Sequence, residues 1–259
     1  MTDRPADPGP LPSCLVLHGL GGGPFELGPL IDALAAAGAR VSAPILPGHG
    51  GPGPRMPAST WAEWAASAEA GFDALAAGGG PVVVVGFSTG ATLAMLLATR
   101  RPVARLVLLA PFLAIRFSGL VPIRPSAYLR HLARVVPDLP RRRPAARDPE
   151  ARRRLRSASP FRTFSLAATL SALDLIATVE PLVPTIRAPT LILQGGRDTV
   201  VEPANAAWLA RHLGSAVKRL ALFPRSDHLL ALDHDRDRVV ASALAFALGR
   251  DNPEGGAAP

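Results

Sequence analysis

Short apolar runs alternate along the chain with longer segments whose apolar residues recur at helical spacing. The clearest run is Val82-Val83-Val84-Val85, four β-branched residues in succession, which predicts a short strand buried on both faces. Similar runs predict strands over 13–19, 40–44, 104–110, 189–196 and 217–223. Helices are predicted over 25–37, 60–77, 91–100, 205–213 and 239–248. Strands and helices that alternate in this way favour an α/β fold with a mostly parallel, doubly wound sheet.

The alternation stops between Pro111 and Ala188. This span holds many prolines and a helical pattern over 166–179, but no convincing strand. Because long loops without structure of their own are uncommon, we expect a helical cap, or lid, inserted at 111–188. The core is then formed by segments 13–110 and 189–249. We expect the tails 1–12 and 250–259 to be disordered.

Composition and charge restrict the class of protein. The chain has 259 residues, of which 48% are hydrophobic, so it can bury a substantial core. No uninterrupted apolar run approaches the roughly 20 residues that span a membrane. Its single cysteine, Cys14, excludes an intrachain disulfide, and nothing in the sequence requires an oxidising compartment, so we expect a cytoplasmic protein.

The net charge of +8 comes almost entirely from arginine, and eight arginines fall between Arg141 and Arg156. No aromatic residue interrupts that run, so stacking on single-stranded nucleic acid lacks a platform, and no nucleic-acid partner is expected. A solvated basic face is the simpler interpretation, although peripheral contact with acidic lipid surfaces stays open.

The valine strand runs into Gly86-Phe87-Ser88-Thr89-Gly90, which fits the G-x-S-x-G pattern. A strand, a tight turn and a helix are the context in which this pattern forms a nucleophile elbow. The Ser88 hydroxyl would then be exposed above the sheet edge. A growing oxyanion needs backbone N–H donors, and Thr89, the residue after the nucleophile, is expected to give one.

Two more polar residues follow predicted strands on the same edge of the sheet. Asp198 follows the next-to-last strand and His228 follows the last, so the chain order is serine, aspartate, histidine. That is the order of an α/β-hydrolase triad. His228 would take the proton of Ser88, and Asp198 would fix the tautomer of the imidazole. His234 is a weaker candidate for the base, and Glu202 is the reserve acid.

Five motifs together resemble the α/β-hydrolase superfamily, and within it the small bacterial carboxylesterases and monoacylglycerol lipases. They are His18-Gly19-Leu20, Pro47-Gly48-His49-Gly50, Gly86-Phe87-Ser88-Thr89-Gly90, Gln194-Gly195-Gly196-Arg197-Asp198 and Ser226-Asp227-His228. The resemblance runs from about 13 to 248. It implies hydrolysis of carboxylic esters with medium or long acyl chains and no metal or organic cofactor. It also implies that Leu20 gives the second oxyanion N–H.

Residues of the insertion are expected to decide which ester is bound. Phe112, Phe117 and Ile176 are candidates for lining an acyl tunnel, although plain packing explains each of them equally well. His49 is expected to organise a loop beside the site and to approach the substrate. The partner would be a small-molecule ester, and the sequence carries no signal of oligomeric state.

Three functions fit these residues. The first is a serine carboxylesterase or monoacylglycerol lipase that forms an acyl-enzyme on Ser88. The second keeps the same triad for thioester hydrolysis or acyl transfer in a biosynthetic pathway. The third is a non-catalytic ligand-binding protein of the same fold, for which a damaged triad would be expected.

Overall fold

The core of the molecule is a six-stranded, fully parallel sheet with the strand order β2-β1-β3-β4-β7-β8. The computed structural model describes residues 11–113, 136–141 and 144–250. The core strands are β1 (Ser13–Leu17), β2 (Arg40–Ser42), β3 (Val82–Phe87), β4 (Arg105–Leu109), β7 (Thr190–Gly195) and β8 (Lys218–Phe223). The predicted α/β class with a mostly parallel sheet is confirmed.

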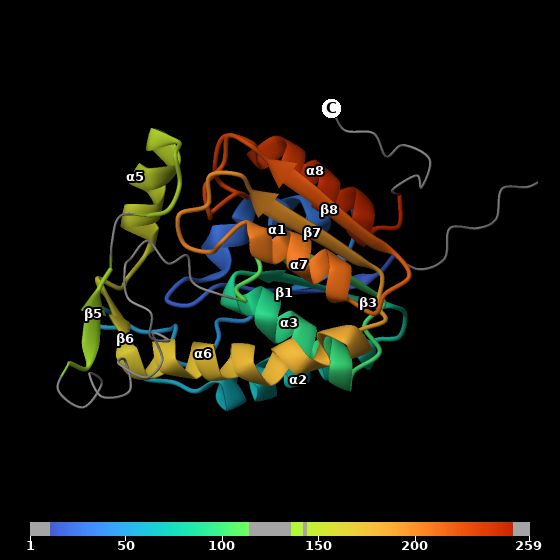
Figure 1. The fold of residues 1–259 in the computed structure, drawn as a ribbon, viewed down its shortest axis with the longest axis horizontal. Helices are drawn as coiled ribbons and strands as arrows, with labels where there is room; N and C mark the ends of the chain where they lie inside the picture. Colours follow the sequence, from blue (N-terminus) through green and yellow to red (C-terminus); the bar gives the residue numbers. More distant parts are fainter. Residues whose placement is uncertain (1–10, 114–135, 142–143, 251–259) are drawn as a thin grey trace, which may run out of the picture.

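Helices cover both faces of this sheet (Figure 1). α1 packs with α8 on one face, and α2 packs with α3 on the other, where α6 lies against both of them. The helices of the core are α1 (Gly28–Ala36), α2 (Trp61–Ala76), α3 (Thr89–Arg100), α7 (Ala204–His212) and α8 (Arg236–Ala247), and a 3-10 turn, η1 (Pro24–Leu27), precedes α1.

Local sequence explains where these elements begin and end. Thr60 caps α2 through a capping box with Glu63, each side chain bonding the other's backbone N–H. The four valines of β3 are all buried, because β3 lies between β1 and β4 with helices on both faces. In this arrangement the carboxyl ends of β3, β7 and β8 meet at one edge, where ligands of open α/β sheets bind.

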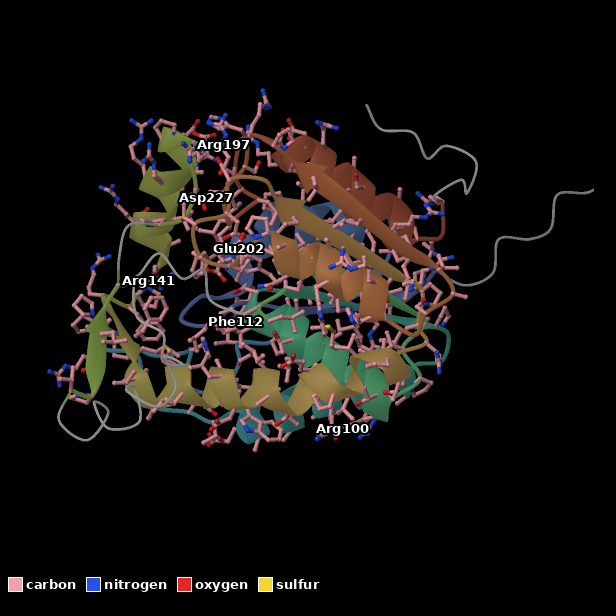
Figure 2. The ribbon with its side chains drawn as sticks, in the orientation of Figure 1. Arg100, Phe112, Arg141, Arg197, Glu202 and Asp227 are labelled. Atoms are coloured by element: carbon pink, nitrogen blue, oxygen red, sulfur yellow. The ribbon has the colours of Figure 1, made fainter. Side chains whose placement is uncertain are left out.

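The insertion between β4 and β7 contains strands that the sequence did not predict. β5 (Asp138–Pro140) pairs antiparallel with β6 (Thr163–Ser165), and α5 (Pro149–Ala158) lies between them in the chain. Each strand has three residues, too few to show an alternating pattern, and one of them includes a proline. The expectation of an insertion without strands was therefore wrong. Arg141 directly follows β5 and lies between this small sheet and the core (Figure 2).

The second part of the insertion belongs to the core layers. α6 (Leu166–Val179) continues into the 3-10 helix η2 (Glu180–Thr185) and packs along α3 and α2. Over Leu166–Thr185 the helix is long and apolar enough to cross a bilayer by length and composition, with a mean hydropathy of 1.6. Its contacts with α2 and α3 explain the apolar residues, so we describe it as a packing helix of the second layer.

Candidate active site

The turn between β3 and α3 holds Ser88 in a strained backbone conformation. Its φ of 54° and ψ of −120° lie where residues with a Cβ are rarely found. The two glycines of the motif make the turn possible. A Cβ at Gly86 would lie 2.4 Å from the carbonyl oxygen of Gly90, and one at Gly90 would lie 2.3 Å from the carbonyl oxygen of Leu17. The predicted elbow is thus present in the described turn.

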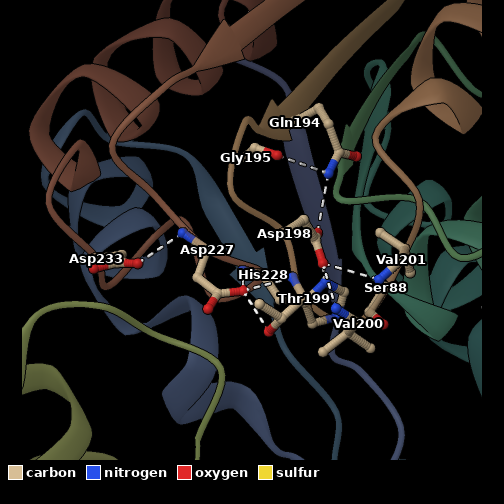
Figure 3. Close-up of polar contacts among 10 residues, drawn as sticks. All are labelled: Ser88, Gln194, Gly195, Asp198, Thr199, Val200, Val201, Asp227, His228 and Asp233. Atoms are coloured by element: carbon tan, nitrogen blue, oxygen red, sulfur yellow. Dashed lines mark hydrogen bonds and ion pairs between the residues drawn. The ribbon is translucent and has the colours of Figure 1, made fainter. Parts of the chain in front are cut away.

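The structure brings Ser88, His228 and Asp198 into one hydrogen-bonded line (Figure 3). The Ser88 Oγ lies 2.9 Å from His228 Nε2, and His228 Nδ1 lies 2.9 Å from Asp198 Oδ2. The three side chains come from the loops after β3, β8 and β7, and all are buried. This geometry assigns Nδ1–H to the side that faces Asp198, which leaves Nε2 able to accept the Ser88 proton.

Asp198 is held ionised by its surroundings. Burial opposes its charge, but the imidazole of His228 and the backbone N–H groups of Val201 and Val200 outweigh burial, so the pKa of Asp198 is lowered from its ordinary value. The side chain of Gln194 also donates to Oδ2, at 3.0 Å. The carboxylate therefore stays an acceptor for His228 near neutral pH.

Two backbone N–H groups border the same cavity as Ser88. Thr89 is the first residue of α3, so its N–H has no acceptor within the helix. Leu20 lies in the loop after β1, and in the described part of the chain neither N–H donates to a protein acceptor. These are the two residues that the sequence and the resemblance assigned to an oxyanion hole.

Two histidines near the loop after β1, His18 and His49, do not border the cavity over Ser88. The Nε2 of His18 accepts the N–H of Leu46 at 3.0 Å, and burial lowers the pKa of His18 to about 3, so its ring is neutral. His49 packs edge-on against His18 and against Trp64. His49 therefore organises the loop, and the expectation that it approaches the substrate is corrected.

A cavity of about 480 Å³ opens over Ser88 and His228. Phe112 lines it, as expected for a substrate contact. Ile176 is instead buried in α6, which packs on α3, and it does not border the cavity. Phe117 falls outside the described residues. Each of these three was chosen from an apolar pattern, which cannot separate a cavity wall from a packed helix face.

The alternative base and acid lie elsewhere. His234 is exposed, at the turn before α8, and it is His228, not His234, that contacts Ser88 and Asp198. Asp198, and not Glu202, accepts the hydrogen bond from His228.

Two aspartates to which the sequence assigned no structural role hold the histidine loop. Asp227 Oδ1 accepts the N–H and the hydroxyl of Thr199 and the N–H of His228, so it fastens the loop of Asp198 to that of His228. Asp233 is fully buried and accepts four backbone N–H groups, those of Arg147, Asp148, Asp227 and His234. Acceptors of backbone N–H groups leave no pattern in a sequence, which explains the omission.

A charged pair, Glu26 and Arg141, also borders the cavity. Glu26 is 5% exposed, and its Oε2 accepts the N–H of Gly19 in the loop of Leu20. Burial raises the pKa of Glu26 to about 7, although the charge of Arg141 opposes that shift. Arg141 Nη1 donates to the carbonyl oxygen of Gly21 and to Ser159 Oγ. The pair thus connects the insertion to the loop after β1.

Comparison with known proteins supports this fold. The family model for serine aminopeptidase S33 matches residues 9–235. A thermostable monoacylglycerol lipase of Bacillus sp. (strain H-257) is 28% identical over 248 residues, which cover 93% of this chain and 92% of the lipase. A pimeloyl-[acyl-carrier protein] methyl ester esterase of Aromatoleum aromaticum is 33% identical, with coverages of 88% and 96%.

Among solved structures, one of two metagenome-derived lipolytic enzymes superposes with a TM-score of 0.81 and 26% identity, covering 91% of this chain and 92% of its own. The resemblance inferred from the five motifs is confirmed. Because the family model spans most of its length, the chain belongs to the serine aminopeptidase S33 family of α/β-hydrolases.

Proposed function

We propose that this α/β-hydrolase cleaves carboxylic esters through an acyl-enzyme on Ser88. The observation that carries the proposal is the line from Ser88 Oγ to His228 Nε2 and from His228 Nδ1 to Asp198, with 2.9 Å at each step. It lies beneath a cavity large enough for a small ester and beside two N–H groups that have no protein acceptor in the described chain.

Each side chain has a role in this chemistry. His228 takes the proton of Ser88 as the oxygen attacks the ester carbonyl, and returns it to the departing alcohol. Asp198 holds the imidazole in position and stabilises its protonated form. The N–H groups of Leu20 and Thr89 donate hydrogen bonds to the carbonyl oxygen and stabilise the negative charge that develops on it. Water then attacks the acyl-Ser88 by the same route, with His228 again as the base.

The relatives suggest which esters to try first. One is named a monoacylglycerol lipase and another a methyl ester esterase, so monoacylglycerols and methyl esters are the starting substrates. Acyl-thioesters and aminoacyl amides are measured beside them, because the same triad can serve both. Ester turnover that exceeds thioester and amide turnover supports the proposal.

The test of the nucleophile uses a fluorophosphonate probe and peptide mapping. The probe should label Ser88, and Ser88→Ala should lose the label and lower ester turnover by about 10⁴-fold or more with an unchanged circular dichroism spectrum. The control is Ser157→Ala, an exposed serine on α5, which should keep both label and turnover. Ser88→Ala with near-native turnover would refute the proposal.

A further inference from the structure

Arg141 places a cation inside an otherwise mostly apolar ester cavity. Its side chain is 18% exposed and borders the same cavity as Ser88 and His228. Its guanidinium also lies over the ring of Phe164 in β6, with 5.1 Å between Cζ and the ring centroid. Burial of a permanent charge beside a reaction centre is costly unless the charge is paired.

The pairing of Arg141 within the described residues is incomplete. Nη1 uses both of its hydrogens, on the carbonyl oxygen of Gly21 and on Ser159 Oγ. Nη2 lies 4.0 Å from Glu26 Oε1, which is too long for a hydrogen bond. Neither Nη2 nor Nε has a hydrogen-bond acceptor in the described part of the chain. Among the described residues, three N–H donors of this cation therefore have no hydrogen-bond acceptor.

These unused donors form a geometrically defined group. The Nε–H and one Nη2–H of a guanidinium point in parallel and match the two oxygens of a carboxylate or phosphate. The two hydrogen bonds made by Nη1 fix the plane of this fork from the other side. Glu26 is a weak competitor for the fork, because it already accepts the N–H of Gly19 and burial raises its pKa to about 7.

We propose that Arg141 is an anion-recognition group of the ester cavity, and that preferred substrates are esters carrying a carboxylate or phosphate away from the scissile bond. The proposal rests on the ester hydrolysis proposed above and names its substrate class. The fixed Nε–Nη2 fork binds the anionic group of the substrate. The apolar cavity walls contact the part of the substrate that joins this anionic group to the ester.

The experiment compares matched charged and neutral esters. One arm sets monomethyl esters of dicarboxylic acids, from succinate to sebacate, against the dimethyl esters of the same acids. The other arm sets acylglycerol phosphates against monoacylglycerols of equal chain length. The first arm detects an anion on the acyl side, and the second detects one on the alcohol side. In at least one arm the wild type should show higher kcat/KM for the charged ester.

Variants assign that preference to a residue. Arg141→Gln should lower the charged-to-neutral ratio of kcat/KM about 10- to 100-fold, the range expected for charge-assisted hydrogen bonds. Arg141→Lys, a point charge without the fork, should keep part of the ratio. Glu26→Gln should raise the ratio, since it removes the competing carboxylate. The matched control is Arg154→Gln, an exposed arginine on α5 outside the cavity, which should keep the wild-type ratio.

Two results would overturn the inference. In the first, the wild type shows no preference for the charged ester in either arm. In the second, Arg141→Gln lowers kcat/KM for the charged and the neutral ester by the same factor. Arg141 would then only hold the loop of Gly21 in place. Hydrolysis of neutral esters in either case leaves the proposed function standing, whereas an unlabelled Ser88 and no ester turnover would remove both proposals.

Discussion

Glu26 is a carboxyl group that folding removes almost completely from water. Its pKa is raised from 4.5 to about 7, first because burial disfavours the charged form, and in spite of Arg141 and the N–H of Gly19. The folded protein therefore binds the Glu26 proton more tightly than the unfolded chain does. The stabilisation that results is fully present below pH 4.5 and is lost as the pH rises through about 7.

The free energy of unfolding of Glu26→Gln should reveal this dependence. Relative to the variant, the wild type should be most stable below pH 4.5 and should lose that advantage as the pH rises toward 7 and beyond. Urea unfolding of both proteins across this range measures the difference. The control is Glu63→Gln in the capping box, where hydrogen bonds from Thr60 lower the pKa and the slope has the opposite sign. A difference that does not change with pH would contradict the assignment.

At the scale of elements, the close contact between α3 and β1 decides where the loops of Leu20 and Ser88 lie. A Cβ on Gly90 would meet the backbone oxygens of Leu17 and His18 at 2.3 and 2.5 Å, and backbone cannot move aside as a flexible side chain can. The start of α3 and the end of β1 can therefore approach this closely because residue 90 has no side chain.

Gly90→Ala should destabilise the protein by about 1–3 kcal/mol and lower ester turnover, because the added methyl group pushes α3 away from the loop after β1. The matched control is Gly28→Ala at the start of α1, where no atom lies within 4 Å of the added Cβ and φ is −44°. That control should gain about 0.4–1 kcal/mol, since alanine restricts the unfolded chain. Urea midpoints and esterase rates measure both; equal midpoints would exclude a steric role for Gly90.

The sequence was informative wherever one residue type fits one environment. Four valines in succession predict β3, the Thr60–Glu63 spacing predicts the start of α2, and the G-x-S-x-G pattern predicts the turn at Ser88. It was uninformative where a contact joins distant segments. Arg141 and Gly21 are 120 residues apart, and nothing in either neighbourhood indicates that they meet. The strands β5 and β6 were missed for a different reason, because three residues are too few to show an alternating pattern.

For the whole molecule, Asp233 joins the loop of His228 to the insertion, whose Arg147 and Asp148 lie 86 and 85 residues away in the sequence. Its Oδ2 accepts the N–H groups of Arg147, in the insertion, and of Asp227, beside His228. Its Oδ1 accepts those of Asp148 and His234. Together with the hydrogen bond from Arg141 to Gly21, these bonds fasten the insertion to the loop after β1 and to the loop of His228.

Asp233→Asn should cost about 2–4 kcal/mol of stability. The amide keeps one oxygen, but its NH₂ group replaces the other, so two of the four buried N–H donors lose their acceptor and face N–H groups instead. Ester turnover should fall as well, since Asp227 and His228 share the loop that Asp233 holds. The control is Asp237→Asn, whose side chain is 95% exposed on α8, and which should change neither quantity. Unfolding curves and kcat/KM together test the idea, and a native-like Asp233→Asn would refute it.

The double attachment of the insertion bears on protein engineering. Grafting the equivalent segment from another family member would remove the backbone groups that Asp233 binds and the guanidinium that contacts the Gly21 loop. A chimera that exchanges the segment alone would then keep only two of the four N–H donors that Asp233 has in this chain, those of Asp227 and His234. Successful swaps in this scaffold should therefore carry residues 19–26 and 227–235 along with the donor segment.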